Sequence, residues 1–160
     1  MEALLMEKAT VKDVVGPVDL NTGANTGARV DMKGFERVSF VCMAAAGTTP
    51  SSHTFSFQQH DAASAGNSAA LSIDNPYYHK LDSATSYTKV VPGAAASSFD
   101  LDTLVGDAKY VVVFEVLAEQ LSEGYRWVSI NQTQAGGAQI GAILAVCHEP
   151  GSKPAYSAVV

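Results

Sequence analysis

The last third of the chain contains three strand-length segments separated by turn signals, and this pattern restricts the fold more than any other feature. Residues 109–117 (KYVVVFEVL) form a continuous apolar run, which is typical of a strand covered on both faces. In residues 125–133 (YRWVSINQT), Val128 and Ile130 share one face and Tyr125 and Trp127 the other. Residues 135–137 (AGG) interrupt the pattern before residues 138–147 (AQIGAILAVC), so a hairpin is expected.

Similar segments occur earlier in the chain. Strand-like alternation is present in residues 35–43 (FERVSFVCM) and 53–60 (HTFSFQQH), and residues 76–80 and 86–91 supply aromatic and β-branched residues for another pair of strands. Seven or eight short strands with hardly any helix predict an all-β fold, an antiparallel β-sandwich of jelly-roll or Greek-key type. The predicted core consists of Phe40, Phe57, Val112, Phe114, Val128, Ile130 and Leu144.

The chain divides by pattern into three parts. Residues 1–34 are interrupted by glycines and a proline and predict an extended N-terminal arm, residues 35–150 the β-sandwich domain, and residues 151–160 a C-terminal tail. The arm is expected to lie across its own sandwich or a neighbouring subunit, or else to be a partly disordered N-terminus. Its apolar residues are the predicted partner-binding residues: Leu4, Leu5, Met6, Val14 and Val15.

The composition favours a protein partner. Of the 160 residues, 16% are charged and 47% hydrophobic, whereas about 25% are charged in ordinary soluble domains. Part of the surface is therefore expected to meet another protein, although an ordinary alanine-rich surface would give the same percentages. The net charge of −6 opposes a partner recognised through its phosphates, so no nucleic acid is expected. No apolar run approaches the roughly 18 residues that span a membrane, and no signal peptide is recognised, so the protein is expected to stay in the cytoplasm where it is made.

Residues with chemical potential are scattered. Cys42 and Cys147 lie in apolar runs and are interpreted as buried free thiols, with a disulfide as the alternative if their strands are neighbours. The aspartates of residues 98–107 are interpreted as a solvated loop, with a calcium site as the alternative. The histidines lack the spacing of metal ligands, and His60-Asp61 is interpreted as a strand end followed by a loop residue. The sequence therefore predicts no catalytic residue, no cofactor and no metal.

Two longer segments carry a family resemblance. Residues 110–150 (YVVVFEVLAEQLSEGYRWVSINQTQAGGAQIGAILAVCHEP), followed by KPAY at 153–156, resemble the small structural proteins of tailed-phage virions. Residues 14–47 (VVGPVDLNTGANTGARVDMKGFERVSFVCMAAAG) resemble the opening of the same proteins, whereas the similarity is loose in residues 61–105.

The resemblance implies a capsid decoration, or cement, protein. Such a protein is a β-sandwich that binds the outside of the phage head and clamps adjacent major capsid subunits, so its place is the outer capsid surface of the virion. It catalyses no reaction, its partner is the major capsid protein, and a homo-oligomer, with a trimer favoured, is expected. Another phage structural role (head completion, tail or fibre) and a carbohydrate-binding module or small cupin-like enzyme are the alternatives.

Overall fold

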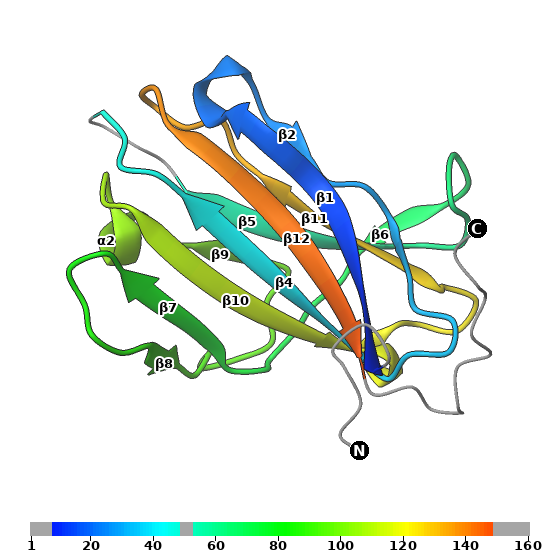
Figure 1. The fold of residues 1–160 in the computed structure, drawn as a ribbon. Coiled ribbons are helices and arrows are strands. Elements are labelled where there is room, and N and C mark those ends of the chain that lie inside the picture. The colour runs from blue at the N-terminus through cyan, green and yellow to red at the C-terminus, as the bar shows by residue number, and fades with distance from the viewer. Residues whose placement is uncertain (1–7, 49–52, 149–160) are drawn as a thin grey trace.

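Two antiparallel sheets pack face to face in the computed structural model of the chain, which describes residues 8–48 and 53–148 (Figure 1). Sheet A has the strand order β1-β12-β4-β10-β7-β8, and sheet B the order β2-β11-β5-β6, with β3 also paired to β11 and β9 to β5. The strands of sheet A are β1 (Ala9–Asp19), β12 (Ile140–His148), β4 (Arg37–Ala44), β10 (Tyr110–Leu117), β7 (Tyr77–Leu81) and β8 (Thr88–Val90). Those of sheet B are β2 (Asn25–Thr26), β3 (Val30–Asp31), β11 (Trp127–Gln132), β5 (Thr54–His60), β6 (Ser68–Ala70) and β9 (Ser98–Asp100). After Lys8, helical turns in the described residues are η1 (Leu20–Thr22), α2 (Asp102–Val105) and η2 (Ala118–Gln120).

The strand pairing is nested from the two ends of the chain inward. β1 pairs with β12, β2 and β3 with β11, β4 with β10, and β5 with β6 and β9, all antiparallel. A long hairpin of this kind, wrapped so that β12 also meets β4 and β11 also meets β5, is a jelly roll. β7 and β8 extend sheet A beyond β10. The prediction of an all-β antiparallel sandwich of jelly-roll type is confirmed.

The predicted N-terminal arm is wrong for the part of it that the structure describes. β1 pairs along its length with β12, and the residues that follow it contribute Leu20, Val30 and Met32 to the core, each 4% exposed or less. Residues 8–34 are therefore the first strands of the sandwich, and position 34 is not a boundary. The physical reason is that β12 and β11 each need a neighbour for their outward-facing amides and carbonyls, and the N-terminal segment supplies both. Residues 1–7 and the predicted tail at 151–160 lie outside the described residues.

Aromatic rings from both sheets form the centre of the core. Phe114 of β10 lies with its ring centroid 5.3 Å from that of Phe57 and 5.6 Å from that of Phe55, both on β5. Tyr77 and Phe99 approach the same ring at 5.1 and 5.5 Å. These are tilted or edge-to-face contacts, which aromatic rings prefer. Phe114 thus joins strands of both sheets.

The predicted core is confirmed except at one position. Phe40, Phe57, Val112, Phe114, Val128 and Ile130 are each at most 1% exposed. Leu144 is half-buried and points away from the core, which Ile143 and Ala145 enter instead. Residues 142–147 are apolar on both sides of the strand, so alternation could not show which side faces inward.

Truncating Phe114 to Ala should lower the free energy of unfolding by about 3–5 kcal/mol, because the ring is fully buried and its neighbours cannot collapse into the space. Chemical denaturation measures the loss. The matched control is Val113→Ala on the same strand, whose side chain points outward and should cost less than about 1 kcal/mol. Equal losses would show that the two faces of β10 are assigned wrongly.

A chain that begins at residue 35 lacks β1, β2 and β3 and should fail to fold, because β12 and β11 lose their neighbours. Circular dichroism with a thermal melt tests this, with a chain that begins at residue 8 as the folded control. A cooperative β-type melt of the shorter chain would restore the interpretation of residues 1–34 as an arm.

Candidate functional site

The outer face of sheet A, on the side away from sheet B, is an apolar surface built from β12, β4, β10 and β7. Residues paired across antiparallel strands point to the same side, so the register defines the rows of this face. One row runs Leu144, Val41, Val113 and Tyr78, from β12 across β4 and β10 to β7. The next row runs Ala142, Met43 and Val111.

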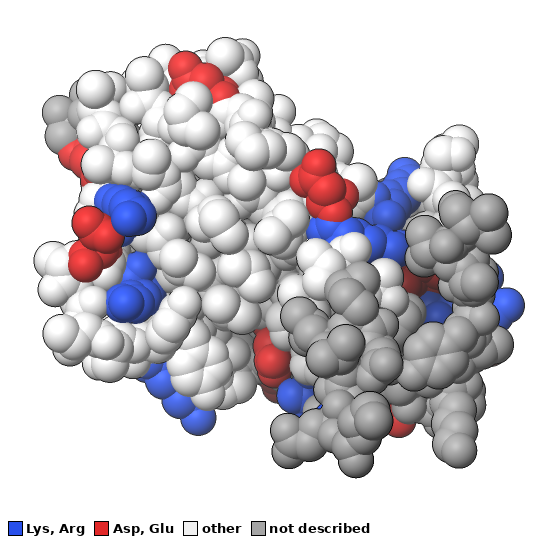
Figure 2. Space-filling model, viewed as in Figure 1, with Lys and Arg blue, Asp and Glu red and all other residues white. Residues whose placement is uncertain are grey.

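Figure 2 shows this face as a broad area without charged side chains, viewed from the side of sheet A. Among its large apolar side chains, Met43 is 37%, Tyr78 39% and Ile140 54% exposed. A pocket at one end of the face is lined mainly by apolar groups of Met43, Val111, Ile140 and Ala142. Contiguous apolar patches of this kind mark protein–protein contact sites.

Charged residues lie at the two long rims of the face and differ in sign. On β1, Asp13 is paired with Leu144 and Asp19 with Ile140, which places carboxylates along one rim. At the opposite rim, Lys89 of β8 is paired with Tyr78, and Lys80 of β7 with Val111. Asp82, just after β7, forms an ion pair with Lys109 at 3.0 Å on the same side of the sheet. The face is therefore apolar in the centre, with Asp13 and Asp19 at one rim and an excess of lysines at the other.

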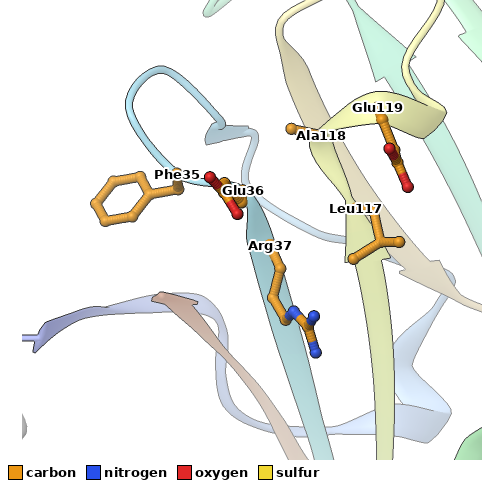
Figure 3. Close-up of a pocket in the computed structure, with 6 residues that line it drawn as sticks. All are labelled: Phe35, Glu36, Arg37, Leu117, Ala118 and Glu119. Atoms are coloured by element: carbon orange, nitrogen blue, oxygen red, sulfur yellow. The ribbon is translucent and has the colours of Figure 1, made fainter. Parts of the chain in front are cut away.

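A polar cluster closes one end of the face. The Arg37 guanidinium lies 3.2 Å from the Glu115 carboxylate, to which the Ser39 hydroxyl also donates at 3.2 Å. Ser39 Oγ lies 2.8 Å from His148 Nε2. Beside this cluster is a pocket between the start of β4 and the end of β10, lined by Phe35, Glu36, Arg37 and residues 117–119 (Figure 3). The pocket is charged, because Glu36, Glu119 and Arg37 line it. The apolar part of the face therefore ends at this pocket.

The outer face of sheet B has a different chemistry. Its β5 residues Ser56 and Gln58 are paired with Asn131 and Ser129 of β11, so polar side chains replace the apolar rows of sheet A. Gln58 is exposed, Ser56 and Asn131 are partly exposed, and Ser129 is buried beside His60. The outer face of sheet A is apolar instead of polar. Among the described residues it is therefore the candidate protein-binding surface.

The predicted partner-binding residues do not form this surface. Val14 is 6% exposed and belongs to the core, and Val15 is partly buried against the core. Leu4, Leu5 and Met6 lie outside the described residues. A sequence signal for the site did exist: residues 109–117 are apolar at successive positions, as a strand covered on both faces would be. The core covers only one of those faces.

The residues with chemical potential lie apart. In residues 8–48 and 53–148, no group of three His, Cys, Asp or Glu side chains is placed to hold a metal ion. Cys42 and Cys147 are buried free thiols, as predicted. Their strands are neighbours, but Cys42 is opposite Ile143, four positions from Cys147. Asp100 and Asp102 act locally: Asp102 accepts from the His53 amide, and its own amide donates to Asp100 at 2.9 Å.

His60 is a strand-end residue, as predicted. Its ring lies between two hydroxyls, with Nδ1 2.7 Å from Ser68 Oγ and Nε2 2.8 Å from Ser129 Oγ. Asp61 instead accepts from the Asn67 amide at 2.8 Å and holds the loop that follows β5. Imidazole and carboxylate therefore have separate structural partners.

His53 belongs to a buried polar network between the sheets. Its Nε2 lies 3.0 Å from the Gly106 carbonyl, so this nitrogen carries the proton and donates. Its Nδ1 then accepts, with Tyr110 Oη at 3.3 Å and Gln132 Nε2 at 3.4 Å. The network gives both ring nitrogens of a fully buried, neutral histidine a hydrogen-bond partner. It also connects the loop after α2 to both sheets.

Comparisons with known proteins give no family. No family model matches the chain, and no curated protein matches it. Among solved structures, the crystal structure of the SPBc2 prophage-derived protein YomS is similar at 14% sequence identity and a TM-score of 0.44, over 86% of this chain and 92% of that chain. In the described residues, no helix has the length and apolar character needed to cross a membrane.

Acid should destabilise the fold through the two buried histidines. Burial lowers the pKa of His53 and His60 because it disfavours the imidazolium, and Arg29 adds to the effect at His60. As the pH falls below about 6.5, the unfolded chain therefore takes up these protons before the folded chain does. The contribution of the two neutral histidines to the free energy of unfolding is complete above that pH and is lost as the pH falls below it.

Thermal melts between pH 8 and pH 5 measure this loss. The unfolding temperature should be constant at the upper end of the range and fall below pH 6.5, and a His60→Gln variant should show a shallower fall. A flat profile for the wild-type chain would contradict the assignment of both histidines as buried and neutral.

Proposed function

We propose that this chain is a non-enzymatic virion structural protein, a capsid decoration protein that binds the outside of a tailed-phage head and stabilises contacts between major capsid subunits. The observation that carries the proposal is the apolar outer face of sheet A, a surface suited to burial against another protein subunit. The resemblance of residues 14–47 and 110–150 to tailed-phage structural proteins gives the partner its class.

The physical work of such a protein is to add contact area. Each square ångström of apolar surface removed from water contributes about 25 cal/mol, so a rigid sheet face can hold subunits together without any reaction. The jelly roll suits this role because Phe114 and its aromatic neighbours fix the two sheets to each other. A force that separates capsid subunits would then have to break their contacts with this domain or deform the domain itself.

The outer face of sheet A would serve equally well in a head-completion, tail or fibre-associated protein. Labelled antibodies against the chain, viewed on virions by electron microscopy, separate these roles by position. Label spread over the head surface supports decoration. Label at the neck or tail would leave a structural role and exclude the capsid.

Binding to heads tests the proposal directly. Purified chain should co-sediment with heads that lack it, and Val113→Glu should reduce the bound amount at least about tenfold, because it places a charge in the apolar face. The matched control is Ser64→Glu in the exposed loop between β5 and β6, which adds the same charge away from the outer faces of both sheets and should bind as the wild type does. Failure of the wild-type chain to bind heads would exclude the capsid as its partner.

A further inference from the structure

We propose that the outer face of sheet A pairs with the same face of a second copy of this chain, about a two-fold axis parallel to the strands. The inference rests on the proposed function in one respect, the assignment of this face to protein binding. It adds the identity of the occupant. The order of residues across the sheet and the charges at its rims favour this pairing.

The central row makes the face complementary to itself. In order across sheet A the row reads Asp13, Leu144, Val41, Val113, Tyr78 and Lys89. A two-fold rotation about an axis along the strands reverses this order in the second copy. Val41 then lies against the partner's Val113, Leu144 against the partner's Tyr78, and Asp13 against the partner's Lys89. In this row apolar residues meet apolar residues, and Asp13 meets the partner's Lys89 at both edges. In the next row the same rotation places Lys80 over the partner's Ala142.

The two rim charges cannot satisfy each other within one chain. Asp13 is on β1 and Lys89 on β8, the first and last strands of the sheet. Strands lie about 4.8 Å apart, so the two residues are separated by roughly 24 Å. An ion pair between them forms only between copies, and it forms twice in a symmetric pair. This opposite charge at opposite rims favours a second copy over a partner of unrelated charge pattern.

The area of the face matches what a stable dimer needs. β1, β12, β4 and β10 are eight to eleven residues long, whereas β7 has five residues and β8 has three. At about 4.8 Å by 3.4 Å for each residue, the six strands cover roughly 720 Å². This area is close to the approximately 800 Å² that each partner buries in a standard interface. Two sheets packed in this way lie about 10 Å apart, as in the interior of a β-sandwich.

The pair would also provide the clamp that a decoration protein requires. With sheet A buried between the copies, the polar outer faces of the two sheets B point in opposite directions. One assembly then presents two identical surfaces, each able to contact a capsid subunit. Bridging arises from the symmetry of the pair, and a trimer is not needed for it.

Sedimentation velocity of the full chain over a concentration series tests the pairing. The wild-type chain should move from monomer to dimer, and Val113→Glu should weaken association at least about 100-fold, because two uncompensated charges are buried at the centre of the interface. Gln58→Glu on sheet B should leave association unchanged. Circular dichroism confirms that each variant is folded.

A charge exchange identifies the arrangement of the two copies. Asp13→Lys and Lys89→Asp should each weaken the dimer on the order of tenfold, because each puts like charges together at both edges. The double variant should recover wild-type association. Both residues are exposed, so neither change is expected to disturb folding.

A wild-type chain that remains monomeric, or that forms a trimer, overturns the inference, as does a dimer that is insensitive to Val113→Glu. Failure of the double variant to recover association overturns the two-fold arrangement. If the free chain is monomeric and Val113→Glu still abolishes binding to heads, the capsid covers this face: the proposed function then stands and the pairing of copies falls. If the dimer forms but does not bind heads, the pairing of copies stands and the proposed function falls.

Discussion

The pairing of β1 with β12 is the interaction on which the rest of the structure depends. It joins the first described strand to the last one and so closes the nested hairpin of the jelly roll. It places Val14 and, just after the strand, Leu20 in the core between the sheets. It also sets Asp13 beside Leu144 at the rim of the outer face of sheet A. Fold, core and candidate surface are therefore consequences of one strand pairing between residues more than a hundred positions apart.

The sequence predicted those parts of the fold in which one side of a strand is apolar and the other polar. Val128 and Ile130 alternate with Ser129 and Asn131, and their burial followed directly. The run that contains Leu144 is apolar on both sides, so its facing could not be predicted. The N-terminal segment was misinterpreted because Gly16 and Pro17 interrupt its pattern. An edge strand accommodates them with register shifts between Asp13 and Val18.

The candidate surface was harder to predict because it exists only across strands. Val41, Val113 and Leu144 come from three separate segments and form one row through the register of β4, β10 and β12. The sequence indicated only its existence, through a low charged fraction and a Val-rich run in β10. The two outer faces suit different kinds of protein contact. The apolar face of sheet A is suited to close packing, and the polar face of sheet B to a hydrated contact. Charged rims limit the apolar face to one orientation of its partner.

The most direct test of the central claim, that the outer face of sheet A is covered by protein in the working state, is hydroxyl-radical oxidation of Met43 read by mass spectrometry. Met43 lies on this face and is 37% exposed in the single chain, whereas Trp127 on the outer side of sheet B provides an internal comparison. Met43 should be oxidised readily in dilute chain and strongly protected in concentrated chain and in virions, while the reactivity of Trp127 stays the same between dilute and concentrated chain. Equal oxidation of Met43 in all three samples would contradict the account.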